Sequence, residues 1–147
     1  MKIRNAALEN IRAHGVEGYP EEICGIMLGP AGDQTVTEVR RVRNVIGQPQ
    51  SRWPELTSER RKDRYEMDDR DQLRIQREAD DSGLDIVGYY HSHPDHPAQA
   101  SQTDAGQAYA GYVYLIVAVH DGEPVDANAF VADNDGGPFH PEPLEIV

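Results

Sequence analysis

The chain has 147 residues, of which 38% are hydrophobic, enough for one core but not for two well-built domains, so we expect one domain spanning residues 1–147. Asp and Glu number 26 and Lys and Arg number 14, which gives a formal net charge of −12 at pH 7. A charge of this sign repels phosphate backbones and anionic lipids, so it disfavours nucleic acid and membrane surfaces as partners.

The cysteine content and the hydropathy exclude further classes of protein. The single cysteine, Cys24, excludes an intramolecular disulfide and a zinc cluster built on cysteines. The longest apolar run, residues 112–119, has the length of a strand and not of a membrane span. Because the N-terminus lacks the apolar core of a signal peptide, we expect a cytoplasmic protein.

The first segment predicts a helix. Ile3, Ala7 and Ile11 recur at four-residue intervals, which is typical of an amphipathic helix that packs one face on a core. Gly15 follows the last of these residues, and we expect the helix to end near it.

A hairpin is expected next. After a break at Tyr19-Pro20, the apolar run 23–29 predicts a buried strand, and residues 30–33 predict a turn. Residues 34–42 alternate between polar and apolar side chains, so they predict a second strand that pairs with the first.

Residues 44–63 fit no regular element. They contain two prolines, the only tryptophan, Trp53, and the basic cluster Arg60-Arg61-Lys62. A compact domain rarely holds about twenty structureless residues unless they serve as a lid or binding loop. Two interpretations stay open: a lid or binding loop, and plain surface disorder.

The middle of the chain predicts a strand, a helix and a second strand. Residues 64–67 predict a short strand. Asp68 is a suitable N-cap for a helix over about 69–81, and Gly83 is placed to end that helix. Residues 85–91 predict the next strand.

The C-terminal part completes an alternating pattern. We expect a loop at 94–100, a short helix over about 101–111 and a buried central strand at 112–119. Residues 125–131 and 144–147 are weaker strand candidates. The alternation of strands and helices predicts an α/β sandwich with a mixed central sheet flanked by helices.

One segment carries residues that suit metal chemistry: His91-Ser92-His93-Pro94, followed by Ser101-Gln102-Thr103-Asp104. His91 and His93 are two residues apart at the end of a strand, so their side chains project from the same face. A loop with two prolines can return Asp104 beside them. Two nitrogen ligands and one oxygen ligand leave a fourth position for water, as in catalytic zinc sites.

Each of these motifs also has a simpler interpretation. A His-x-His pair on a strand is often a surface or packed pair of histidines. Ser101-x-x-Asp104 is by itself a variant of the capping box, with Ser101 as the N-cap. The two motifs at this spacing favour a metal site, and capping is compatible with ligation.

A zinc hydrolase also needs a base, and the His-Glu-x-x-His helix of common zinc proteases is absent. Glu22 stands at the start of the first predicted strand, directly before an apolar run. Burial there would raise its pKa toward the range useful for a base. The alternative is a solvated carboxylate at a strand end.

The joint pattern of Glu22-x-Cys24-Gly25, His91-x-His93-Pro94 and Ser101-x-x-Asp104 resembles the JAMM (MPN+, Mov34) zinc metalloprotease family in order and spacing. Tyr65-Glu66-Met67-Asp68 is similar to the short bacterial branch of that family. The resemblance covers the chain from about residue 3 to at least residue 120. It implies a cytidine-deaminase-like α/β fold.

The resemblance also implies an activity. It implies a zinc-dependent peptidase or isopeptidase that cleaves after the C-terminal glycine of a ubiquitin-like or sulfur-carrier protein, with zinc-bound water as the nucleophile. By this resemblance, the three zinc ligands would be His91, His93 and Asp104. Glu22 would be the general base, and Ser101 would support the oxyanion.

Two departures from the family concern loops. Ala100 stands where the family often has Pro before the Ser, and residues 44–63 are longer than in the shortest members. Both departures bear on loop shape and specificity more than on zinc binding.

Two other functions are considered. A catalytically silent MPN scaffold that binds protein partners typically lacks a ligand or the Glu, whereas here all five positions are filled. A DNA-repair relative typically has His-Asn-His-Pro-Ser-Gly around the motif, and a chain of charge −12 is poorly suited to DNA.

Overall fold

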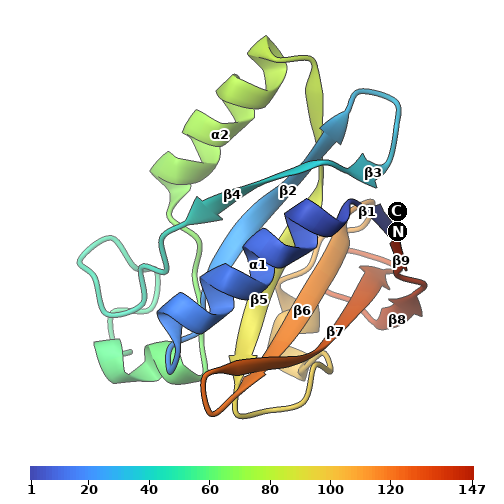
Figure 1. The fold of residues 1–147 in the computed structure, drawn as a ribbon. Helices are drawn as coiled ribbons and strands as arrows, with labels where there is room; N and C mark the ends of the chain where they lie inside the picture. Colours follow the sequence, from blue (N-terminus) through green and yellow to red (C-terminus); the bar gives the residue numbers. More distant parts are fainter.

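The alternating pattern of the sequence folds into a six-stranded sheet with helices on its two faces (Figure 1), in a computed structural model that describes residues 1–147. The strand order is β4–β2–β5–β6–β7–β8. β5 and β6 are parallel and the other neighbours are antiparallel, so the expected mixed sheet is confirmed. The strands are β2 (Cys24–Pro30), β4 (Glu38–Val42), β5 (Leu84–Pro94), β6 (Val113–His120), β7 (Glu123–Ala132) and β8 (Phe139–Glu142).

A second, three-stranded sheet brings the two ends of the chain together (Figure 1). Its order is β3 (Thr35–Val36), β1 (Lys2–Ile3) and β9 (Glu145–Ile146), and both pairings are parallel. Two expectations are corrected here. Ile3 belongs to a strand and not to the first helix, and the strand expected at 34–42 is divided between the two sheets.

Helix α1 (Asn5–Gly18) covers one face of the large sheet. Its buried residues Leu8 and Ile11 pack in a core cluster with residues of the sheet. The expected end near Gly15 is wrong, because the helix continues for three more residues. A Cβ atom on Gly15 would lie 3.0 Å from Cγ2 of Val119, so this glycine permits close packing of α1 against β6.

Helix α2 (Asp69–Asp81) covers the opposite face, where Ile75 and Ala79 pack in a cluster with Cys24 and Ile26 of β2. Its bounds agree with the sequence prediction. Gly83 follows it with a φ of +69°, a left-handed conformation that glycine adopts at low cost.

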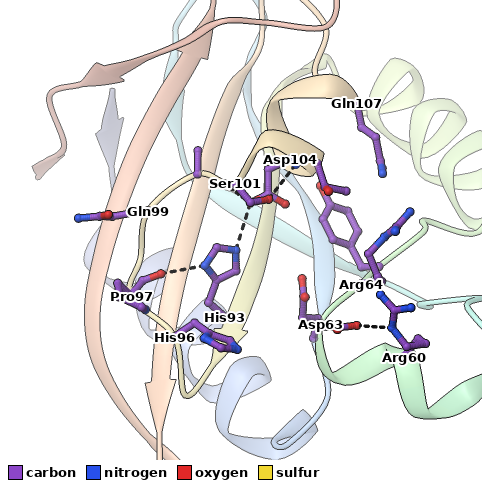
Figure 2. Close-up of a pocket in the computed structure, with 14 residues that line it drawn as sticks. Arg60, Asp63, Arg64, His93, His96, Pro97, Gln99, Ser101, Asp104 and Gln107 are labelled. Carbon is purple, nitrogen blue, oxygen red and sulfur yellow. Dashed lines mark hydrogen bonds and ion pairs between the residues drawn. The ribbon is translucent and has the colours of Figure 1, made fainter.

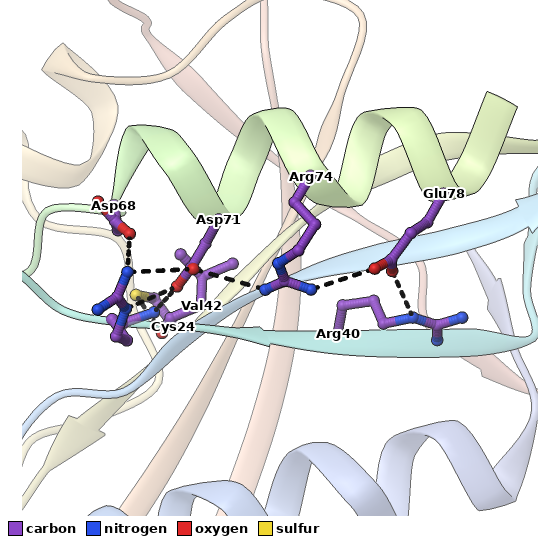
Figure 3. A network of polar contacts seen from close by, with 8 residues as sticks. Cys24, Arg40, Val42, Asp68, Asp71, Arg74 and Glu78 are labelled. Carbon is purple, nitrogen blue, oxygen red and sulfur yellow. Dashed lines mark hydrogen bonds and ion pairs between the residues drawn. The ribbon is translucent and has the colours of Figure 1, made fainter.

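Ion pairs tie α2 and Asp68, which precedes it, to β4 and to Arg43, which follows β4 (Figure 3). The expected cap is corrected here: the carboxylate of Asp68 makes no cap hydrogen bond and instead pairs with Arg43. Asp71 lies 3.2 Å from Nε of Arg43. Further along the helix, Glu78 lies 3.2 Å from Nη1 of Arg74 and 3.8 Å from Nε of Arg40.

Residues 44–63 form an ordered segment that lies beside Glu22 instead of a disordered one. Val45 and Ile46 are buried, and the segment ends in a short 3-10 helix, η1 (Ser58–Lys62). The backbone N–H of Glu22 donates to the carbonyl of Arg61 at 2.6 Å. These contacts are against surface disorder, and a role as a lid or binding loop stays a prediction.

Three further elements differ from the sequence prediction. Helix α3 (Gln102–Gly106) ends before residue 111, and β8 has no signal in the sequence because its residues are polar or proline after Phe139. Residues 64–67 form only an isolated bridge, in which Met67 pairs with Asn44. No helix of the structure combines the length and the apolarity that a membrane crossing requires.

Candidate metal centre and active site

Strand β5 positions the two histidines. It continues to Pro94, beyond the end expected at residue 91, because residues 92–94 pair with residues 117–119 of β6. His91 is the cross-strand partner of Cys24, whose side chain packs in the cluster under α2. Both histidines are buried, and they project on this face of the sheet.

The loop after β5 and the start of α3 return Asp104 to the histidines. The capping box expected from the sequence is formed: Ser101 Oγ accepts from the Asp104 N–H at 3.0 Å, and the Ser101 N–H donates to Asp104 Oδ2 at 3.0 Å. The same carboxylate places Oδ1 3.2 Å from Nε2 of His91. Its Oδ2 lies 3.1 Å from Nε2 of His93 (Figure 2). One short helix turn therefore serves both the cap and the cluster.

The donor atoms of this cluster fit a metal ion. Nε2 of His91 and Nε2 of His93 are 3.2 Å apart. Nδ1 of His93 lies 2.8 Å from the carbonyl oxygen of Pro97, which can only accept, so in the neutral ring Nε2 of His93 presents a lone pair to the cluster. Lone pairs that converge at this spacing repel one another unless a proton or a metal cation lies between them. Imidazole nitrogens with a carboxylate are a donor set that suits zinc.

Glu22 lies beside the histidines and is itself buried. Its ligand oxygen and the nitrogens of His91 and His93 all lie within 4.8 Å of one another. Its place is fixed through the next residue, because Ile23 and Ser92 exchange two hydrogen bonds of 3.0 Å. The structure thus holds a buried Glu-His-His cluster that is compatible with a metal site.

The two carboxylates of the cluster have pKa values that shift in opposite directions. Burial raises the pKa of Glu22 to about 8, and Asp104 adds to this effect while His93 opposes it. Burial also acts to raise the pKa of Asp104, but His91 and His93 hold that pKa well below its usual range. Asp104 is therefore charged at neutral pH, whereas Glu22 binds a proton much more readily than an ordinary carboxylate does.

A cavity of about 530 Å³ opens over the cluster (Figure 2). Among the sequence candidates, Glu22, His93, Ser101 and Asp104 line it, whereas His91 lies beneath it and is only 1% exposed. All five candidates are thus brought together at one end of β5.

Two contacts of the site are not evident from the sequence. Tyr65 stacks on the imidazole of His91, with ring centroids 4.5 Å apart, and the Asn44 side chain donates to the carbonyl of Glu22 at 3.1 Å. The sequence offers Tyr65 only as part of a family motif, and it offers no signal for Asn44, because both contacts depend on how residues 44–67 fold back onto the sheet.

Comparison with known proteins agrees with this geometry. Residues 4–132 match the family described as prokaryotic homologs of the JAB domain. A desampylase from Haloferax volcanii is 35% identical over 115 residues, which cover 75% of this chain and 74% of that protein. A CysO-cysteine peptidase from Mycobacterium tuberculosis is 26% identical over 147 residues, which cover 99% of this chain and 90% of that protein.

Solved structures of other proteins share the fold of this chain. A protein from Salinibacter ruber is 38% identical with a TM-score of 0.70, and the match covers 100% of this chain and 92% of that one. A JAB1/MPN domain protein from Archaeoglobus fulgidus shares the fold, with a TM-score of 0.61 at 17% identity over 100% of this chain and 97% of that one. The chain therefore belongs to the prokaryotic JAB (JAMM/MPN) family.

Proposed function

We propose that this protein is a zinc-dependent peptidase or isopeptidase that cleaves after the C-terminal glycine of a ubiquitin-like protein of the sulfur-carrier class. The observation that carries the proposal is the convergence of His91, His93 and Asp104 at 3.1–3.2 Å, with Glu22 beside them. The relatives named desampylase and CysO-cysteine peptidase support the same class of reaction.

The proposed metal ligands are His91, His93 and Asp104. A bound zinc ion supplies a Lewis acid that lowers the pKa of a coordinated water and polarises a carbonyl oxygen. The hydrogen bond from Nδ1 of His93 to Pro97 fixes the orientation of that ring, and the capping box fixes Asp104.

Glu22 is the proposed general base. Its buried carboxylate takes a proton from the attacking water and later delivers the proton to the nitrogen of the leaving amine. Its burial supports this role, because burial raises the pKa of a carboxylate above its ordinary value and toward the range that suits proton transfer near neutral pH.

Ser101 is proposed to support the oxyanion. Its Oγ already accepts the N–H of Asp104, so the hydroxyl proton remains available for an acceptor in the cavity that Ser101 lines. A donor placed in this way stabilises the negative charge that develops on the scissile carbonyl oxygen.

The carrier body is proposed to contact η1. Sulfur-carrier proteins of the implied class are often acidic, and η1 holds three cations in a chain of net charge −12. Arg60 pairs with Asp63 and Arg61 pairs with Glu21, which leaves Lys62 as the exposed cation of η1 without an acidic partner.

The test uses a ubiquitin-fold carrier protein whose C-terminal Gly-Gly is joined to cysteine by an amide bond. We expect the zinc-loaded protein to release a carrier that ends in a free Gly-Gly carboxylate, as measured by intact mass. An adduct that stays intact with the zinc-loaded protein contradicts the proposal.

A further inference from the structure

Arg64 is an unpaired cation at the edge of the active-site cavity. Nε of its guanidinium is buried and has no hydrogen-bond partner. Arg60 is the other arginine that lines this cavity, and its Nε pairs with Asp63 at 2.9 Å, whereas Arg64 has no acidic partner within 4.0 Å. A cation that lines a cavity and has no carboxylate partner can bind an acceptor that enters the cavity.

Arg64 is tied to Glu22. Nδ2 of Asn44 donates to the backbone carbonyls of both residues, at 3.1 Å to Glu22 and at 3.0 Å to Arg64. Both residues line the same cavity, and Figure 2 shows Arg64 on the side across from His93. Asn44 therefore holds the backbone of Arg64 beside that of Glu22, and both residues line the cavity.

Trp53 orients the guanidinium. The guanidinium carbon of Arg64 lies 5.1 Å from the centroid of the Trp53 ring, so one face of the cation rests on the indole. Stacking covers one face of the cation, and Nε is buried, so the terminal Nη groups are the ones that can bind a carboxylate in the cavity through two hydrogen bonds.

The chemistry of the proposed hydrolysis places a carboxylate near this cation. A C–O bond forms at the glycine carbonyl, the C–N bond breaks, and the proton from water passes through Glu22 to the leaving nitrogen. That nitrogen must lie beside Glu22. In an α-amino acid the carboxylate carbon is two bonds from the nitrogen, whereas a lysine side chain carries only methylenes there.

We propose that Arg64 binds the α-carboxylate of the leaving group, so that the preferred substrate is a carrier joined through its glycine to a free amino acid. This inference rests on the proposed hydrolase function and specifies its leaving group. A different acceptor, a peptide carbonyl of the carrier tail, would use Arg64 equally for every leaving group, and this difference is what the experiment measures.

The experiment compares two adducts of one carrier, Gly-Gly-cysteine and Gly-Gly-cysteamine, which differ only in the carboxylate. For the zinc-loaded wild type we expect kcat/KM to be about 10- to 100-fold higher for the cysteine adduct, the range of a charge-assisted pair. Arg64→Gln should bring this ratio close to 1, and Arg64→Lys should give an intermediate ratio. Arg60→Gln removes the same charge from the same cavity, but its Nε already bonds Asp63 at 2.9 Å, so the ratio should persist.

The outcomes separate the two proposals. A wild-type ratio near 1, or a high ratio that persists in Arg64→Gln and Arg64→Lys, overturns the role of Arg64 and leaves the hydrolase function standing. Failure of the zinc-loaded wild type to cleave either adduct overturns the hydrolase function itself. Thermal melting verifies that each variant is folded. A wild-type ratio near 1 overturns the role of Arg64 without any variant.

Discussion

The phenol ring of Tyr65 stacks on the imidazole of His91, with ring centroids 4.5 Å apart and ring planes inclined by 27°. Since His91 is buried at the base of the cavity, this contact fixes the orientation of a proposed zinc ligand. We expect Tyr65→Ala to weaken zinc binding by about 10-fold or more, whereas Tyr65→Phe, which keeps the ring, retains it. Competition with a chromophoric chelator measures both, and equal affinity of the alanine variant and the wild type would remove Tyr65 from the site.

The second prediction separates metal binding from chemistry at Glu22. Glu22→Gln keeps the size of the side chain but cannot accept the proton, so turnover should fall by about 10²–10⁴-fold while zinc content stays at one equivalent. Elemental analysis and the rate of adduct cleavage are measured on the same preparation. Activity within a few-fold of the wild type would exclude Glu22 as the base, and loss of zinc would make it a ligand instead.

Much of the architecture follows from local pattern. The bounds of α2 agree with the sequence because its apolar spacing, the acidic residues of its first turn and Gly83 all act locally. The helix expected to stop at Gly15 does not, because the glycine serves a contact with Val119 on a distant strand. Features that depend on tertiary packing, including the small sheet and β8, have no comparable signal in the sequence.

The candidate site also has a part that the sequence predicts and a part that depends on tertiary packing. The spacing of His91, His93 and Asp104 indicates one cluster, and the structure brings them within 3.2 Å of one another. The sequence does not reveal that Asn44 links Glu22 to Arg64, because that side chain acts on two backbone carbonyls that are distant in sequence. Such contacts become visible only once residues 44–67 are placed beside the metal ligands.

The third prediction concerns the carrier. Deletion of residues 44–63 is an unsuitable test of carrier binding. The carbonyl of Arg61 accepts the N–H of Glu22, so the deletion would also disturb the active site. Lys62 is exposed and has no acidic partner, so Lys62→Glu should raise KM for an acidic carrier adduct several-fold with little change in kcat. Steady-state kinetics at low and high salt measure this effect. A collapsed kcat with an unchanged KM would place η1 in the catalytic centre.

The fourth prediction concerns stability against pH. Nδ1 of His14 lies 2.8 Å from the hydroxyl of Tyr90, and burial, aided by Arg41, lowers the pKa of His14 from 6.5 to about 4. Between these two pH values the unfolded chain binds more protons at this residue than the folded chain does, so the contribution of His14 to stability is lost as pH falls from 6.5 toward 4.

The matched variant is His14→Asn, which does not titrate in this range. The loss of unfolding free energy between pH 7.5 and pH 4.5 should therefore be smaller for the variant than for the wild type, as measured by urea denaturation. The same loss in both proteins would contradict a depressed pKa of His14.

The central claim is that hydrolysis depends on a metal held by His91, His93 and Asp104, and its most direct test is reconstitution. The protein is stripped with a chelator, and cleavage of the carrier Gly-Gly-cysteine adduct is followed as zinc is added back, in the wild type and in His93→Ala. We predict no cleavage without zinc, full recovery at one equivalent in the wild type, and neither stoichiometric zinc nor recovery in the variant. Full cleavage by the metal-free wild type, or stoichiometric zinc with full activity in His93→Ala, would contradict the claim.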